Sequence, residues 1–296
     1  MKIAVTGGAG FIGQHLVRAL SRRGHALTVL DNLRRGSFET AALEGATLIQ
    51  GDIRDSATCD VAFRGVNCVV HLAAQSNVMG SESDPSYTVE TNVSGTWTVA
   101  QAAAAAGAPH LLFASSREVY GEPQTMPVPE AAPFSARNLY GATKISGEAL
   151  LGTFPNPQLR TSILRLSNVI GPGDTGRVVP LWLTAARAQE PLILYGGEQV
   201  LDFVPVELVV DAFVAICERG PIGAPVNIGS GLPVTLRELA GRIIAMTGSR
   251  STLEVRPARG PEVSRYCADV SRMERCLGLT PPADAVGMIA RWAVIP

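Results

Sequence analysis

Tyr140 and Lys144 are the residues whose types and spacing point most directly to chemistry. They stand four positions apart in "NLYGATKISGEAL" (residues 138–150) and share one face if this stretch is helical. Lys144 and Lys2 are the only lysines in a chain that otherwise takes its positive charge from arginine. A cation one turn away favours a phenolate and lowers the phenol's pKa from its usual value of about 10. The pattern predicts that Lys144 tunes Tyr140 to take a proton from a substrate hydroxyl while hydride leaves the same carbon, although a lysine snorkelling beside a packed tyrosine has the same spacing.

A second hydroxyl that could orient the substrate lies at the end of a predicted strand, "HLLFASS" (residues 110–116). Ser115 and Ser116 stand at its carboxyl end, where open α/β sheets place their ligands. The sequence therefore predicts a Ser–Tyr–Lys set.

A glycine-rich turn, "VTGGAGFIG", follows the first predicted strand and opens the first predicted helix. Gly8, Gly10 and Gly13 match the G-x-G-x-x-G pattern, and Gly7, Gly10 and Gly13 equally match a three-spaced pattern. Such glycines permit a tight turn and let a pyrophosphate approach the amides at a helix N-terminus. Because strand, turn and helix occur in the required order, the pattern predicts dinucleotide binding rather than a purely structural turn.

Residues after the second and third strands bear on which dinucleotide is bound. Asp31 lies about 20 residues beyond the turn, where a carboxylate accepts hydrogen bonds from ribose hydroxyls. The same carboxylate repels the 2′-phosphate of NADP, whereas Arg34 and Arg35 could neutralise that phosphate or be solvated loop residues. Asp52 ends the third strand and could face the adenine amine or lie in a surface turn. We expect NAD as the cofactor.

The elements that must position these residues alternate along the first half of the chain. Nearly continuous apolar runs separated by helical stretches indicate a parallel sheet covered on both faces. The strands are predicted at residues 2–6, 26–31, 46–52, 67–74 and 110–116, and the helices at residues 11–22, 55–64 and 87–106. We expect an α/β fold with a doubly wound parallel (Rossmann) sheet and a smaller C-terminal α/β substrate lobe.

Beyond about residue 170 this rhythm loosens, and Pro and Gly become frequent in "GPGDTG", "YGGEQ", "GPIGAP" and "GSGLP". Short, irregularly alternating strands and helices are typical of a lobe that shapes a pocket. One helix is predicted at residues 236–246, with Thr235 as its N-cap. We expect residues 1–170 to form the NAD-binding domain that carries the Ser–Tyr–Lys set, and residues 171–296 the smaller substrate lobe, with the chain crossing between lobes.

Composition excludes several classes of function. The 296-residue chain has a net charge of −1 and no basic block, which argues against a nucleic-acid partner. Its longest apolar stretches are strand-sized, so no membrane span is expected. The five cysteines and four histidines are scattered, which argues against a disulfide framework and a metal site. The start, "MKIAVTGGAG", shows no signal-peptide pattern, and we expect a cytoplasmic protein.

Motifs along nearly the whole chain, from Lys2 to about Leu279, resemble those of the extended short-chain dehydrogenase/reductase family. In order they are "TGGAGFIG", "HLAAQS", "NVSGT", "SSREVYG", "YGATK", "NVIGPGD" and "NIGSG". More narrowly, the chain is similar to the nucleotide-sugar epimerase/dehydratase branch. That resemblance implies an NAD-dependent enzyme acting on a nucleotide sugar. It also implies a homodimer, because members often pair helices corresponding to residues 87–106 and 138–151 in a four-helix bundle.

The resemblance also implies roles for individual residues. Ser116, rather than Ser115, matches the family's catalytic hydroxyl, and Tyr140 and Lys144 match its YxxxK pair. The residues that match its cofactor site are Gly7, Gly10, Phe11, Ile12, Gly13, Asp31, Asn32, Asp52, Ile53, Leu72, Ala73, Ala74 and Asn92, together with Tyr140 and Lys144.

The same branch supports several reactions, all starting with hydride transfer from C4 of the sugar to NAD. A 4-epimerase needs only Ser, Tyr and Lys and room for the keto-sugar to rotate, whereas a 4,6-dehydratase also needs a C5 base and an acid for the C6 hydroxyl. In "SSREVYG", Glu118 stands at the base position, but Arg117 replaces the acid and cannot donate a proton at neutral pH. The resemblance therefore favours a 4-epimerase of the UDP-glucose/UDP-galactose type. The alternatives are a dehydratase or a UDP-glucuronate decarboxylase that uses Glu118 for C5 chemistry, a mere Arg117–Glu118 ion pair at the pocket wall, and a non-catalytic NAD-binding regulatory module.

Substrate-binding residues are implied by position in the family pattern. Asn168 and Arg259 fall where the family contacts the substrate diphosphate. Tyr266 matches a position that limits room for an N-acetyl group, so a bulky side chain there favours plain hexoses; otherwise it is a half-buried aromatic in a strand.

Two positions depart from the family pattern. Leu201 replaces an arginine that usually contacts a substrate phosphate, and the loss of a bidentate pair weakens diphosphate binding. Arg177 is the residue expected to compensate. Ser167 stands where an aromatic side chain is common beside the nicotinamide.

Overall fold

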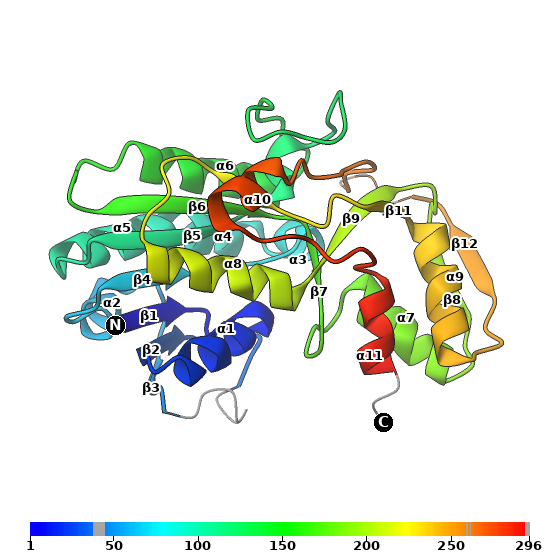
Figure 1. Cartoon of the computed structure of the whole chain (residues 1–296), viewed down its shortest axis with the longest axis horizontal. Coiled ribbons are helices and arrows are strands. Elements are labelled where there is room, and N and C mark those ends of the chain that lie inside the picture. The colour runs from blue at the N-terminus through cyan, green and yellow to red at the C-terminus, as the bar shows by residue number, and fades with distance from the viewer. Residues whose placement is uncertain (38–44, 259, 261, 294–296) are drawn as a thin grey trace.

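A seven-stranded parallel sheet forms the centre of the larger lobe, in the order β10-β6-β5-β4-β1-β2-β3 (Figure 1). The computed structural model describes residues 1–37, 45–258, 260 and 262–293. The strands are β1 (Lys2–Thr6), β2 (Ala26–Asp31), β3 (Thr47–Gln50), β4 (Cys68–His71), β5 (His110–Ser116), β6 (Arg160–Leu166) and β10 (Val226–Ile228). The strands predicted at residues 2–6, 26–31 and 110–116 are confirmed to the residue, and those predicted at residues 46–52 and 67–74 are shorter.

The strand order reverses between β1 and β4, which makes this the point where open sheets bind ligands. Thr6 of β1 stands between Leu30 of β2 and His71 of β4, so the carboxyl ends of the three strands are level. Ser116 of β5 pairs with Leu166 of β6 at the same edge. Loops after all five strands therefore meet along one edge.

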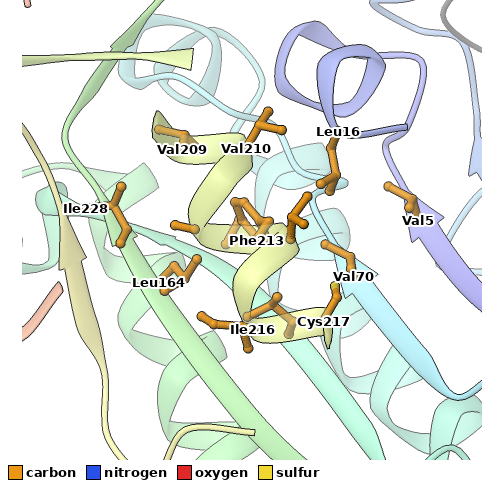
Figure 2. Packing of buried hydrophobic residues seen from close by; sticks show 14 of the residues in the cluster. Val5, Leu16, Val70, Leu164, Val209, Val210, Phe213, Ile216, Cys217 and Ile228 are labelled. Atoms are coloured by element: carbon orange, nitrogen blue, oxygen red, sulfur yellow. The ribbon is translucent and has the colours of Figure 1, made fainter. Parts of the chain in front are cut away.

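Helices cover both faces of this sheet because the strand side chains alternate between two apolar clusters. Val5 packs with the face covered by α1, α8 and α10, whereas Ala4 packs with the face covered by α2, α5 and α6. Figure 2 shows Phe213 of α8 at the centre of the first cluster, among side chains of α1 and of the strands. The helices are α1 (Phe11–Arg22), α2 (Ser56–Ala62), α5 (Gly95–Ala105), α6 (Leu139–Gly152), α8 (Val206–Arg219) and α10 (Ser271–Leu277).

The helix predicted at residues 87–106 is built from consecutive pieces. They are α4 (Pro85–Val89), a π-helical turn (Glu90–Ser94) and α5, and they follow the short α3 (Val78–Ser83). In the described part of the chain, no helix is long and apolar enough to cross a bilayer.

The smaller lobe packs around its own apolar cluster, which includes Trp182, Phe203 and Leu239 (Figure 1). Thr235 caps the predicted helix α9 as expected, since its hydroxyl accepts the Glu238 amide at 3.0 Å. The elements are β7 (Asn168–Ile170), α7 (Val178–Arg187), β8 (Leu192–Tyr195), β9 (Val200–Pro205), β11 (Pro233–Thr235), α9 (Leu236–Thr247), β12 (Leu253–Arg256), a 3₁₀ turn (Gly287–Ile289) and α11 (Ala290–Ala293). The chain crosses between lobes, because α8, β10 and α10 return to the large sheet.

Candidate functional site

A cavity of about 820 Å³ lies along the carboxyl edge of the large sheet and extends to β8 and β9 of the smaller lobe. Most residues predicted from the sequence line it: Gly7, Gly10, Phe11, Ile12, Gly13, Asp31, Asn32, Ile53, Leu72, Ala73, Ala74, Ser116, Glu118, Tyr140, Lys144, Asn168 and Arg177. Asp52, Asn92 and Tyr266 are not part of its lining. Arg259 lies outside the described residues.

The glycine turn at one end of the cavity fits a pyrophosphate. Gly7 has a φ of +72°, and a Cβ on Gly13 would lie 2.2 Å from the Gly7 carbonyl oxygen. Helix α1 begins after Gly10 without a side-chain cap, so its first amides are available to an anion. The backbone geometry therefore suits the dinucleotide that the sequence predicts.

Asp31 both shapes this turn and faces the cavity. Its two carboxylate oxygens accept the amides of Ala9 at 3.0 Å and Leu33 at 2.9 Å. Burial raises the pKa of Asp31, and these two hydrogen bonds oppose that rise. Each oxygen keeps a further lone pair with which it can accept a ribose hydroxyl. Arg34, a possible partner for a 2′-phosphate, instead pairs with Asp84 at 2.9 Å.

Asp52 and Asn92, which were predicted to line the cofactor, lie next to lining residues and bond to protein groups. The Asp52 carboxylate forms an ion pair with Arg54 at 2.9 Å and accepts a hydrogen bond from Asn32 at 3.1 Å. The buried Asn92 amide bonds both the N–H and the carbonyl of Gln75, at 2.8 and 3.1 Å, so it fixes the loop after β4. Both polar groups thus have partners within the protein.

Ser116, Tyr140 and Lys144 meet at the middle of the cavity. Ser116 ends β5, and Tyr140 and Lys144 lie one turn apart on α6. Asn138 caps α6 by accepting the Gly141 amide at 2.8 Å, and this fixes where the helix starts. Lys144 Nζ donates to the Ala114 carbonyl at 2.8 Å and lies 5.8 Å from the centre of the Tyr140 ring.

Tyr140 does not have the lowered pKa that its spacing from Lys144 predicts, because burial outweighs the charges around it. Loss of solvent raises the Tyr140 pKa to about 12, while Arg177, a hydrogen bond with Ser116, and Arg117 act in the opposite direction. Burial lowers the pKa of Lys144 itself to about 7. The physical reason is that the fold removes water from both groups, which disfavours the charged form of each.

Glu118 forms an ion pair with Arg117 on the cavity wall, which was one of the alternatives that the sequence left open for this residue. Its Oε1 contacts Arg117 Nη2 at 2.8 Å, and its Oε2 accepts the Asn138 amide at 2.8 Å. Arg117 also donates to Asn168 Oδ1 at 3.3 Å. Both carboxylate oxygens are thus held by donors from the cavity wall, which limits the availability of Glu118 as a mobile base.

Tyr266, predicted to limit room for an N-acetyl group, is fully buried next to the cavity wall. Tyr266 is 0% exposed and stacks on Tyr120, with ring centres 6.0 Å apart. The guanidinium of Arg117 lies 5.7 Å from its ring centre, and Arg117 is the residue that faces the cavity. The family position survives in the sequence, but packing places the side chain behind the wall.

Arg177 lies beside the glycine turn rather than deep in the smaller lobe. Its guanidinium is 5.7 Å from the Phe11 ring centre and 3.6 Å from Asp174. The departures Ser167 and Leu201 both line the cavity, as the motif positions imply.

Sequence reasoning missed a buried ion pair beneath the site. Glu148 on α6 and Arg165 on β6 are joined at 2.7 Å, with side chains 4% and 5% exposed. The available signal was an arginine inside the apolar strand "TSILRLS", together with a carboxylate one turn beyond Lys144.

Comparison with known proteins agrees with this architecture. The model of the NAD dependent epimerase/dehydratase family matches residues 3–229. The UDP-glucose 4-epimerase of Mycolicibacterium smegmatis is 34% identical over 304 residues, which cover 98% of this chain and 97% of that protein. A putative UDP-glucose 4-epimerase of Methanocaldococcus jannaschii is also 34% identical, with the same coverage.

Solved structures give the same picture. The UDP-glucose 4-epimerase of Thermotoga maritima with UDP-glucose has a TM-score of 0.93 and 30% identity, covering 99% of this chain and 98% of that one. The dTDP-glucose 4,6-dehydratase of Streptomyces venezuelae with bound NAD has a TM-score of 0.92 and 31% identity, covering 99% and 96%. Epimerases and dehydratases thus share this fold, and the reaction must be argued from the site.

Proposed function

Because this chain belongs to the NAD dependent epimerase/dehydratase family, we propose that it is an NAD-dependent nucleotide-sugar 4-epimerase. The substrates proposed are UDP-hexoses, which interconvert through a transient 4-keto sugar. The observation that carries the proposal is Ser116, Tyr140 and Lys144 on one cavity wall, with no further acid at the position next to Ser116.

Each catalytic side chain has a separate task. Tyr140 takes the proton of the C4 hydroxyl and later returns it. Ser116 holds the same substrate oxygen by a hydrogen bond, and the Lys144 ammonium favours the phenolate. When bound, NAD supplies the acceptor for the C4 hydride and returns that hydride. The glycine turn and Asp31 are the groups proposed to hold the pyrophosphate and the ribose.

The direct test is to incubate the purified protein with UDP-galactose and separate the nucleotide sugars by chromatography. We expect UDP-glucose of unchanged mass to accumulate. A panel of other nucleotide sugars, analysed by mass spectrometry, distinguishes the alternatives: loss of 18 mass units indicates dehydration, and loss of 44 indicates decarboxylation. Absence of any conversion, with NAD bound but never reduced, would instead support a regulatory module.

Glu118→Gln should leave epimerisation within about fivefold of the unmodified protein, because Glu118 is held by Arg117 and Asn138 and epimerisation at C4 requires no proton transfer by it. Glutamine keeps the length of the side chain and the contact with Asn138. Steady-state kcat is the measurement. In deuterated water, exchange at C5 that depends on Glu118 would contradict this prediction and favour the dehydratase or decarboxylase reading.

A homodimer through α4–α5 and α6 is proposed as the assembly. Exposed Val89 on α4, and exposed Ala142 and Ala149 on α6, support it, since small and apolar residues let helices approach closely. Light scattering should give twice the chain mass, and Val89→Glu should shift the protein towards monomer. A monomeric unmodified protein at micromolar concentration would count against the dimer.

We also propose that the protein works in the cytoplasm. All five cysteines are free, which suits a reducing compartment. Fractionation of cells that express a tagged chain tests this location.

A further inference from the structure

Glu148 is a buried carboxylate on the same helix as Tyr140 and Lys144. Its side chain is 4% exposed. Arg165 binds both carboxylate oxygens in a bidentate pair, with Nε to Oε1 at 2.9 Å and Nη2 to Oε2 at 2.7 Å. The hydroxyl of Ser115 donates to the same Oε1. Since Glu148 lies one turn beyond Lys144, the two side chains share one face of α6.

Three consecutive residues of β5 each contact a different side chain on the face of α6 that carries Tyr140, Lys144 and Glu148. The Ala114 carbonyl accepts Lys144 Nζ at 2.8 Å, Ser115 donates to Glu148, and Ser116 bonds with Tyr140. A shift of the helix along the strand would break all these contacts together. Glu148 therefore helps to fix the register between the helix that carries the base and the strand that carries the catalytic hydroxyl.

Arg165 extends the same network to a third element. Its Nη1 donates to the hydroxyl of Tyr120 at 2.8 Å, and that hydroxyl donates to Asn227 Oδ1 at 2.7 Å. Tyr120 belongs to the 3₁₀ turn (Arg117–Tyr120) that also carries Glu118. A buried ion pair adds little net stability over an apolar replacement of similar size, so stability alone does not account for this one.

We propose that Glu148, held by Arg165, is a positioning residue that seats the catalytic helix against β5 and supplies the counter-charge for the buried Lys144 ammonium. The consequence for turnover rests on the proposed function. The effect on Lys144 rests on the Glu148 carboxylate one turn beyond it on α6, and not on the proposed function.

The groups around Lys144 determine in which direction loss of the Glu148 charge shifts the Lys144 pKa. Its own helix presents Glu148 and Tyr140, β5 presents the Phe113 ring at 4.7 Å, and β4 presents His71. His71 is neutral at pH 7, because burial, assisted by the charge of Lys144, lowers its pKa to about 3. Burial lowers the pKa of Lys144 to about 7, and Glu148 opposes that fall. Removing the Glu148 charge should therefore lower the pKa of Lys144 further.

The scarcity of lysine makes this measurable without an activity assay. Protein labelled with ¹³C-lysine gives signals from Lys2 and Lys144 only, and Lys2→Arg assigns them. We expect Glu148→Gln in the NAD-bound enzyme to move the Lys144 titration down by about one pH unit. Ser115→Ala removes a hydrogen bond but no charge and should leave the titration unchanged.

A second variant guards against loss of folding. Glu148→Gln together with Arg165→Met removes the ion pair without leaving an unpaired buried charge. It should lower the Lys144 titration in the same direction but by less, because the Arg165 cation is removed with the carboxylate. In the same variant, the alkaline limb of the pH profile of kcat/KM should move to lower pH together with the Lys144 titration. Glu148→Asp keeps the negative charge and should leave that limb at its original pH. An unchanged Lys144 titration in whichever Glu148 variant folds would overturn the inference. Failure of the unmodified protein to epimerise any nucleotide sugar would remove the proposed function but not this result.

Discussion

Tyr140→Phe should lower kcat about 10²- to 10⁴-fold, because it removes the hydroxyl that we propose exchanges a proton with the sugar. The phenyl ring still fills the half-buried position on the cavity wall, so the fold should remain intact. Conversion of UDP-galactose to UDP-glucose, followed by chromatography, is the measurement.

NAD content and melting temperature are the controls for Tyr140→Phe. Both should match those of the unmodified protein, so that the loss is one of chemistry rather than of binding. Turnover that falls less than about tenfold would mean that another group moves the proton. Because burial raises the pKa of Tyr140 to about 12, we also expect activity to rise with pH as more phenolate forms, until Lys144, whose pKa burial lowers to about 7, loses its proton.

Gly13→Ala should weaken NAD binding at least about tenfold and destabilise the fold by about 1–3 kcal/mol. The added Cβ would meet the Gly7 carbonyl oxygen at 2.2 Å and the Gly8 Cα at 2.6 Å. These are backbone atoms, so the turn itself must move. Isothermal titration with NAD and thermal unfolding measure the two effects.

Gly241→Ala is the matched control for this substitution. Gly241 lies inside α9, and nothing lies within 4 Å of an added Cβ. Alanine there should stabilise the protein by about 0.5–1 kcal/mol and leave NAD binding unchanged. If Gly13→Ala behaved like Gly241→Ala, the close packing of the glycine turn would have no role in holding the cofactor.

The local patterns of the sequence were enough to predict much of the larger lobe. The first helix and strands β1, β2 and β5 begin and end where periodicity and turn residues predicted, because each buries an apolar face next to a clear break. In the smaller lobe the sequence predicted only one helix, α9, since the short strands of that lobe pair with distant segments and carry little local signal.

The candidate site divides in the same way. The glycine turn, Asp31 and the Tyr140–Lys144 spacing are local motifs, and the cavity gathers them as expected. Tyr266 and Asn92 matched motif positions equally well, and the fold gives both of them protein partners: Tyr266 stacks on Tyr120, and Asn92 hydrogen-bonds the backbone of Gln75. Motif position records where a residue stands along the chain, whereas its role depends on which neighbours satisfy its polar groups.

The sequence by itself determined the doubly wound sheet, the dinucleotide turn and the spacing of the candidate Ser–Tyr–Lys set, because these follow from patterns within single elements. Only the tertiary structure decided which charges surround them. Glu148 and Arg165 stand on the consecutive elements α6 and β6, and their side chains meet only because α6 packs against the large sheet. Burial, which lowers the Lys144 pKa and raises that of Tyr140, is likewise a property of the assembled fold, since it depends on every element that excludes water from the site.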